Sequence, residues 1–247
     1  IFPPMTDKTQ TSSLIDRAGL DRARVRSIVS TGLDGADDGE LFLEYRQSEA
    51  LGFDNGRLKQ ATYDTAQGFG LRAVLGEAAG YAHAGEISEA ALKRAAETVK
   101  AVRRGRSGTL DVAPRPTNAR LYDDANPLSA MEFAAKTGLL AEIDGYARGR
   151  DKRVRQVMAS LAGEWQVVRI LRADGREVAD IRPLVRLNVS VVVEQDGRRE
   201  TGSHGLGGRF SYDRIVEDGV WKGAVAEALR QALVNLDSVP APAGEME

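Results

Sequence analysis

The chain has 247 residues, of which 42% are hydrophobic and 28% are charged, and these values are typical of a globular protein with one large or two ordinary domains. A formal net charge of −2 gives no global attraction to nucleic acid or to an anionic membrane. Membrane helices are also excluded, because no apolar run approaches the roughly 18 residues that one requires.

The absence of cysteine excludes disulfides and thiolate metal ligands, and it is compatible with the reducing cytoplasm in which we expect the protein. Residues 1–5 (IFPPM) lack the basic and apolar regions of a signal peptide. We therefore interpret Met5 as the natural start.

The first half of the chain predicts helices, then strands, then a helix. A weak 3.6-residue apolar pattern predicts helix over the first forty residues, and residues 34–39 (DGADDG) predict a loop. Short strands are expected at 41–46, 58–65, 68–75 and 78–83, with a type I′ turn at Asn55-Gly56. A helix then begins at Ser88 and ends at Gly105, with one apolar stripe formed by Ile87, Ala91, Ala95, Val99 and Val102.

The second half repeats this order. A helix is predicted to open at Asn126-Pro127 and to end at Gly149, with the stripe Leu128, Met131, Ala135, Leu139, Ile143 and Tyr146. Strands follow at 154–161, 164–171, 177–181 and 184–194, with turns at Asp174-Gly175 and Asp196-Gly197, and a short strand over 206–212. Arg182-Pro183 predicts an interruption or an edge, because proline donates no hydrogen bond. The last helix runs to Pro240 on the stripe Trp221, Val225, Leu229, Leu233 and Leu236.

These elements predict an α+β fold of two antiparallel β-meander regions, each followed or flanked by amphipathic helices. We place the N-terminal region at residues 1–105, a linker at 106–126, and the second region at 127–247.

No catalytic or metal site can be assembled from the sequence. His83 and His204 stand about 120 residues apart without further ligands at metal-binding spacing, so ordinary hydrogen bonds are the favoured interpretation. Residues 34–45 fail as a calcium loop, since Ala36 and Tyr45 occupy ligand positions. The acidic residues Asp37, Asp38, Asp123 and Asp124 are interpreted as solvated or capping residues in loops.

Two further patterns favour structural roles. Residues 202–208 (GSHGLGG) lack the third glycine of a dinucleotide loop, where Phe210 stands, so we expect a flexible loop or a strand bend. A basic cluster without interleaved aromatic residues predicts a solvated connection rather than a nucleic-acid site. Its members are Arg148, Arg150, Lys152, Arg153 and Arg155.

Five blocks, in order, resemble the amino-terminal half of the metalloprotease subunit of the TldD/PmbA (modulator of DNA gyrase) family. They read EYRQSEALGFDNGRLKQ at 44–60, GFGLRA at 68–73, GYAH at 80–83, IDGYAR at 143–148 and GSHGLGG at 202–208. The resemblance extends from about Ser13 to the end of the chain.

The resemblance implies a bacterial or archaeal zinc peptidase that acts with a homologous, non-catalytic subunit on unfolded peptides, such as microcin-type antibiotics or an unfolded antitoxin. The family's zinc motif, H-E-x-x-x-H, lies just beyond a segment similar to Pro240–Gly244, and a ligand cysteine follows later. Neither is in this sequence, so we expect a zinc metallopeptidase in the full-length protein and neither zinc nor activity in these 247 residues.

Three alternatives stay open. This region can be the assembly and substrate-admitting half, whose β edges pair with a PmbA-like partner, a second copy or an extended peptide. It can be a self-contained binding module that lost its catalytic half. A nucleic-acid protein is a third possibility, and it predicts steeply salt-dependent DNA affinity.

Overall fold

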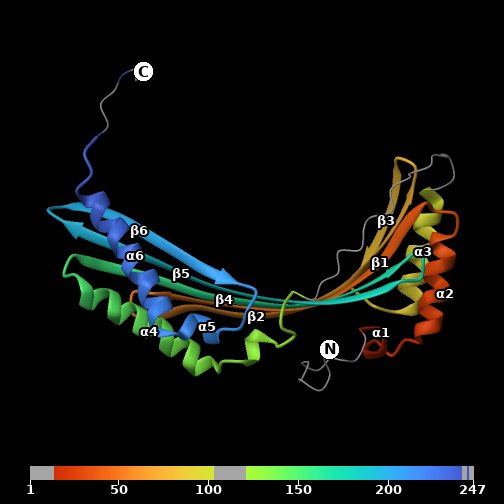
Figure 1. The fold of residues 1–247 in the computed structure, drawn as a ribbon, viewed down its shortest axis with the longest axis horizontal. Coiled ribbons are helices and arrows are strands. Elements are labelled where there is room, and N and C mark those ends of the chain that lie inside the picture. The colour runs from red at the N-terminus through yellow and green to blue at the C-terminus, as the bar shows by residue number, and fades with distance from the viewer. Residues whose placement is uncertain (1–13, 103–120, 241–243, 245–247) are drawn as a thin grey trace. The chain divides into compact units, whose positions relative to one another are not determined.

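The computed structural model describes residues 14–102, 121–240 and 244. The predicted start at Met5, the predicted cap at Gly105 and most of the predicted linker lie outside these residues. Figure 1 shows the elements, which are, in chain order, α1 (Leu14–Arg17), α2 (Arg22–Leu33), β1 (Asp38–Asp54), β2 (Arg57–Leu75), β3 (Ala78–Ala84), α3 (Glu89–Val102), the 3-10 turn η2 (Pro127–Ser129), α4 (Phe133–Arg150), β4 (Val154–Arg172), β5 (Glu177–Gln195), β6 (Arg198–Gly208), α5 (Asp213–Val216) and α6 (Asp218–Leu236).

The strands form one antiparallel sheet in the order β3-β2-β1-β4-β5-β6. The two predicted meanders, β1 to β3 and β4 to β6, are therefore joined into a single sheet through the β1–β4 pair. Helices precede and follow each meander in the chain, which confirms the predicted α+β class.

The strands are longer than the sequence predicts. The predicted pairs 58–65 with 68–75, 154–161 with 164–171, and 177–181 with 184–194 are continuous in β2, β4 and β5, so the predicted breaks were wrong. Pro183 is tolerated because the β5–β6 pairing begins only at Val185, and the missing N–H therefore removes no bond to β6. Gly163 lies within β4, where a Cβ would come within 2.6 Å of the Leu128 side chain.

Two hairpins have type I′ turns, one at Asn55-Gly56, where this type was predicted, and one at Asp196-Gly197, where a turn was predicted. Both central residues have positive φ at Asn55 (51°) and Gly56 (77°), and again at Asp196 (53°) and Gly197 (83°). The hairpin at Asp174-Gly175 is also present. Its turn is of another type, because only Gly175 has a positive φ (82°).

The chain folds into two compact units, each built from three segments. Of the described residues, unit 1 comprises those within 14–47, 64–125 and 165–183, and unit 2 comprises those within 48–63, 126–164 and 184–240. Each unit has its own hydrophobic core. In unit 1, α2 and α3 pack together over residues such as Leu43, Leu71 and Trp165.

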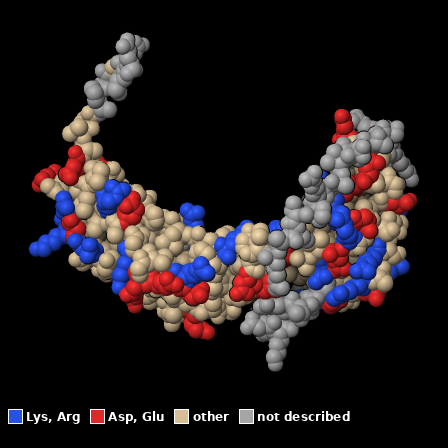
Figure 2. Space-filling model, viewed as in Figure 1, with Lys and Arg blue, Asp and Glu red and all other residues tan. Residues whose placement is uncertain are grey.

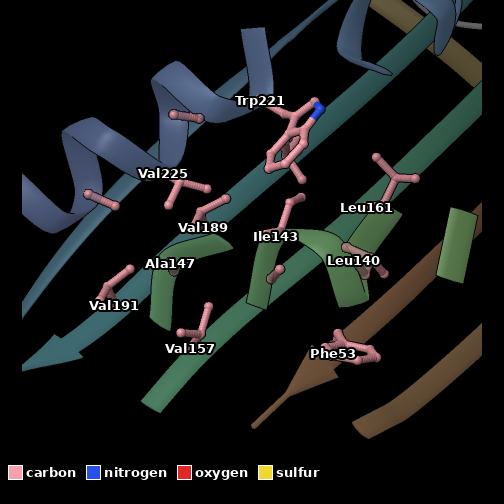
Figure 3. Packing of buried hydrophobic residues seen from close by; sticks show 14 of the residues in the cluster. Phe53, Leu140, Ile143, Ala147, Val157, Leu161, Val189, Val191, Trp221 and Val225 are labelled. Carbon is pink, nitrogen blue, oxygen red and sulfur yellow. The ribbon is translucent and has the colours of Figure 1, made fainter. Parts of the chain in front are cut away.

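The core of unit 2 lies between the sheet and the helices α4 and α6. Ile143 of α4 and Trp221 and Val225 of α6 are almost fully buried, and they pack in one cluster with Val157 of β4 and Val189 of β5 (Figure 3). The predicted stripe of α6 is confirmed at Trp221, Val225, Leu229 and Leu236, with Leu233 packed against the cluster.

Side-chain caps account for two of the helix starts. Asp21 accepts a hydrogen bond from the Arg24 amide (2.7 Å) at the start of α2. Ser88 accepts one from the Ala91 amide (3.2 Å) at α3, as predicted. The predicted apolar stripe of α3 is buried at Ile87, Ala91, Ala95 and Val99.

The helix predicted to open at Asn126 begins later. Asn126 caps only the 3-10 turn, by accepting from the Leu128 amide (3.0 Å), and α4 starts at Phe133. The Leu128 carbonyl, which a continuous helix would bond to the Glu132 amide, instead accepts from Lys136 Nζ (2.8 Å). Within α4, Ala135 is exposed and not part of the predicted apolar stripe, whereas Leu139 and Ile143 are buried as predicted.

Acidic and basic side chains are interspersed on the face shown in Figure 2, and no region of one sign dominates it. This distribution agrees with the small net charge. None of the helices in the described ranges has the length and apolar character needed to cross a membrane.

Candidate binding groove and buried ion pair

The two histidines lie in different units and have different surroundings. His83 of β3 stacks on Tyr81, with ring centroids 5.6 Å apart, in unit 1. His204 of β6 pairs in register with Val189, in unit 2. In the part of the chain that the structure describes, no group of three His, Asp or Glu residues could hold a metal ion. These residues therefore do not fit a zinc site.

The predicted basic cluster is engaged in local contacts. Arg148 forms an ion pair with Asp144 (2.9 Å) and also donates to Asn55 in the β1–β2 turn. Arg153 binds Asp151 through its side chain and its amide. These bonds lower the pKa of Asp151 to about 2. Arg155 donates to the Lys152 carbonyl (3.0 Å). The cluster thus fixes the α4–β4 connection.

Arg150 and the acidic residues Asp37, Asp123 and Asp124 also have structural partners. Arg150 lies over the Tyr146 ring. Asp37 accepts from the Gly76 amide (2.7 Å), and Asp123 accepts from the Ala125 amide (3.1 Å), as expected for capping residues. The Asp124 carbonyl accepts from the Trp165 indole (3.2 Å).

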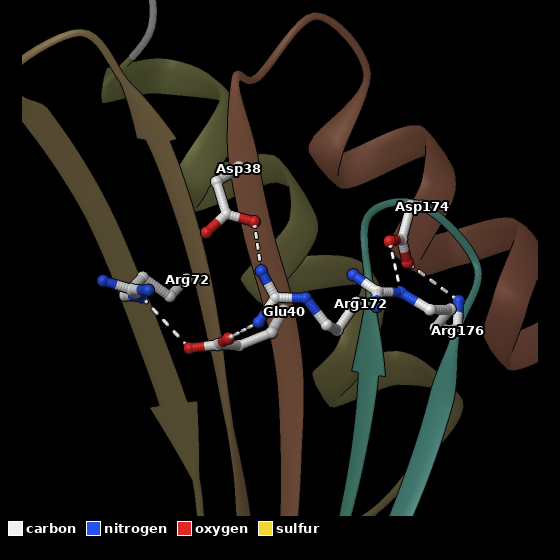
Figure 4. A network of polar contacts seen from close by, with 6 residues as sticks. All are labelled: Asp38, Glu40, Arg72, Arg172, Asp174 and Arg176. Atoms are coloured by element: carbon white, nitrogen blue, oxygen red, sulfur yellow. Dashed lines mark hydrogen bonds and ion pairs between the residues drawn. The ribbon is translucent and has the colours of Figure 1, made fainter. Parts of the chain in front are cut away.

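Asp38 was predicted to lie in a loop, and this prediction was wrong, because Asp38 is the first residue of β1. Arg172 of β4 donates to Asp38 (2.7 Å) and to Glu40 (3.3 Å), and Arg72 of β2 donates to the other Glu40 oxygen (3.2 Å), as Figure 4 shows. This network joins three adjacent strands of unit 1. Its geometry satisfies every carboxylate with an arginine, so it is a stabilising element rather than a metal site.

The glycine-rich segment 202–208 is neither a loop nor a bend. It forms most of β6 and pairs with β5 in regular register from Gly202↔Val191 to Gly208↔Val185. The prediction was wrong because the glycines serve packing: a Cβ at Gly202 would collide with the Ala228 carbonyl and the Ala232 amide of α6. The missing side chain lets α6 approach the strand closely.

A groove of about 560 Å³ lies in unit 2. It is lined by segments of β1, β2, β4, β5 and β6, and this volume is within the usual range for ligand sites. Arg186, Asn188 and Ser190 line it and alternate along β5 with the core residues Leu187 and Val189. Because successive strand side chains point to opposite faces, the groove lies on the face away from the helix-packed core.

A row of polar side chains crosses this groove. Arg186 Nε donates to Asn188 Oδ1 (2.8 Å), and Asn188 Nδ2 donates to Ser160 Oγ of β4 (3.3 Å). The neighbouring strand contributes Gly205, which pairs with Asn188. A Cβ at Gly205 would lie 2.7 Å from Asn188 Oδ1 and 3.1 Å from Arg186 Nη2, so glycine makes room for the row.

A second cavity, of about 390 Å³ in unit 2, has a buried ion pair in its wall. Lys136 Nζ lies 2.5 Å from Glu49 Oε1, with side-chain exposures of 3% and 11%, and 5.0 Å from the centre of the Tyr212 ring. Burial, with a smaller contribution from the Glu49 charge, raises the pKa of Tyr212 well above its ordinary value. The exposed rings of Tyr63 and Phe133 also line this cavity.

Sequence reasoning identified neither Lys136 nor Arg186. Lys136 falls at helical spacing with Leu139, Leu140 and Ile143, so a charged residue inside an apolar stripe was an available signal. Arg186 carried no such signal, because alternating polar residues are ordinary on a strand with one solvated face.

Two family models match the chain in order. Residues 39–103 match the PmbA/TldA metallopeptidase domain 1, and residues 126–236 match the PmbA/TldA metallopeptidase central domain. The chain belongs to the TldD/PmbA family.

Relatives named as homologues of the metalloprotease TldD agree with this assignment. The chain is 41% identical to one from Haemophilus influenzae over 85% of this chain and 45% of the relative. It is 34% identical to one from Buchnera aphidicola subsp. Schizaphis graminum over 97% of this chain and 51% of the relative. The chain thus spans about half the length of the curated relatives it matches.

Solved structures of low sequence identity share the fold. One is a protein from Thermotoga maritima that is named as a candidate modulator of a DNA gyrase. It superposes with a TM-score of 0.70 at 14% sequence identity, and the match covers 90% of this chain and 49% of the Thermotoga chain. TldE from Thermococcus kodakarensis superposes with a TM-score of 0.67 at 14% sequence identity, and the match covers 85% of this chain and 47% of the TldE chain.

Proposed function

We propose that this chain is the amino-terminal half of a TldD-like zinc metallopeptidase that processes unfolded peptides in the cytoplasm with a homologous PmbA-like subunit or as a homodimer. The observation that carries this proposal is the ordered match of domain 1 and the central domain of a metallopeptidase family. The proposal also includes a linker at residues 106–126 between the two regions. The match to domain 1 ends at residue 103 and the match to the central domain begins at residue 126, which supports this division.

In this proposal the zinc ligands and the general base lie on polypeptide beyond these 247 residues. The sequence supports this placement, since it has only two histidines, no cysteine and no H-E-x-x-x-H motif. In the same proposal, these 247 residues form the β-sheet, bind the partner subunit and hold the substrate.

The test compares this chain with the protein from the complete reading frame. Zinc per chain is measured by elemental analysis, and cleavage of an unfolded peptide is measured with and without the homologous subunit. We expect about one zinc and cleavage for the longer protein, and neither for the 247 residues. One tightly held zinc on the shorter chain would contradict the proposal.

A second candidate function is a peptide-binding or assembly module without catalysis of its own. The groove of about 560 Å³ and the outer positions of β3 and β6 in the strand order favour it, because an extended peptide can add to an open strand edge. The same comparison separates the two functions: this one predicts a longer protein that binds the peptide without cutting it.

A further inference from the structure

The groove of unit 2 contains cations without ion-pair partners. Lys59 and Arg186 line it against a single carboxylate, Asp54, and Asp54 accepts from Gln156 Nε2 (2.7 Å). Across the described ranges, neither Lys59 nor the terminal Nη groups of Arg186 form an ion pair or hydrogen bond. Several arginine and lysine side chains elsewhere in unit 2 form ion pairs, as at Lys136, Arg148 and Arg153.

The polar row presents the Arg186 guanidinium in a fixed position. Its Nε is held by Asn188, and Asn188 is held by Ser160, so the guanidinium is ordered from one side. The pair of Nη groups is left for a ligand, and two parallel N–H donors match the two oxygens of a carboxylate. Ser190 and Ser203, which face each other across the β5–β6 pair and also line the groove, supply hydroxyl donors.

We infer that this groove binds a carboxylate of an extended polypeptide, with Arg186 as the principal contact. The polypeptide nature of the ligand rests on the proposed function, whereas the carboxylate follows from the groove. Met158, which is 37% exposed, gives the groove apolar surface for the rest of such a segment. An acidic side chain and a chain terminus offer the same chemistry, and the experiment distinguishes them.

The experiment measures binding of the 247-residue protein to fluorescent, unstructured ten-residue peptides by anisotropy at low salt. One peptide contains four glutamates, the second contains four glutamines instead, and each is made with a free and an amidated C-terminus. We expect the glutamate peptide to bind about fivefold to tenfold more tightly than its glutamine counterpart, with the preference falling as salt screens the exposed groove. If amidation alone abolishes binding, the carboxylate site stands and its ligand is the chain terminus.

Three variants locate the site. Arg186→Gln should remove the preference for carboxylate, and Arg155→Gln, which makes the same change in net charge on β4 outside the groove, should change affinity less than twofold. Gly205→Ala retains every charge but displaces Asn188 and Arg186, and it should weaken binding as Arg186→Gln does. Circular dichroism checks that each variant is folded.

Equal affinity for the glutamate and glutamine peptides, combined with tolerance of C-terminal amidation, would overturn the inference. So would equal effects of Arg186→Gln and Arg155→Gln, or binding of no peptide at all. None of these results bears on zinc content or cleavage by the longer protein, so the proposed function would stand or fall separately.

Discussion

The buried pair of Lys136 and Glu49 gives the sharpest stability prediction. The Lys136 side chain is 3% exposed, and among the residues that the structure describes its ammonium has only Glu49 and the Leu128 carbonyl as hydrogen-bond acceptors. Replacing Glu49 with Gln removes the compensating charge while keeping an oxygen acceptor of the same size. Because an uncompensated buried charge is costly, Glu49→Gln should lower the free energy of unfolding by about 3–5 kcal/mol.

The double variant distinguishes charge from packing. Lys136→Met fills a similar volume without a charge, so adding it to Glu49→Gln removes the ammonium that the single variant leaves unpaired. We expect the double variant to recover more than half of the loss. The two substitutions should therefore be strongly non-additive, as is usual for residues in contact.

Urea unfolding followed by tryptophan fluorescence measures these free energies, since Trp221 lies in the core of the same unit. The matched control is the pair Lys222 and Asp218 on α6, whose side chains are 36% and 75% exposed. Its corresponding double-variant cycle should show no measurable coupling. Additive effects at Lys136 and Glu49 would refute the reasoning, as would a loss at Glu49→Gln no larger than that of a surface substitution.

Three further predictions concern single contacts. Gly138→Ala in α4, where nothing lies within 4 Å of the added Cβ, should raise the free energy of unfolding by about 1 kcal/mol. Gly202→Ala should lower the free energy of unfolding by about 1–3 kcal/mol, because the added Cβ collides with α6. The opposite order of the two urea midpoints would contradict both expectations. Arg172→Gln should lower the free energy of unfolding by about 1 kcal/mol, because the bonds to Asp38 and Glu40 are lost. Arg176→Gln at the exposed turn should leave the melting temperature unchanged. Similar losses of stability in both variants would show that the network in Figure 4 does not stabilise the fold. Arg153 lowers the pKa of Asp151 to about 2, below the unfolded value of roughly 3.9. The ionised carboxylate therefore stabilises the fold above about pH 4, and this contribution is lost as the pH falls toward 2. The difference in urea midpoint between the parent protein and Asp151→Asn should narrow over that pH range, and a constant difference would refute the assignment.

The sequence by itself determined the features that depend on neighbouring residues. The α+β class, the type I′ turn at Asn55-Gly56, the turn at Asp196-Gly197 and the Ser88 cap of α3 are all confirmed, because positive φ angles, capping oxygens and apolar periodicity act over a few residues. The resemblance to the TldD/PmbA family was carried by short contiguous blocks, and the family models confirm it.

Only the tertiary structure decided the features that depend on distant partners. Residues 202–208 form a strand because they pair in register with β5, and the glycine at 202 leaves room for α6. Lys136 is buried beside Glu49, 87 positions away, whose charge compensates its own. The position of the Arg186 guanidinium beside Gly205 likewise depends on the register of β5 against β6. Glycine, lysine and arginine each allow several environments, so the energy that selects one comes from contacts that local sequence patterns do not encode.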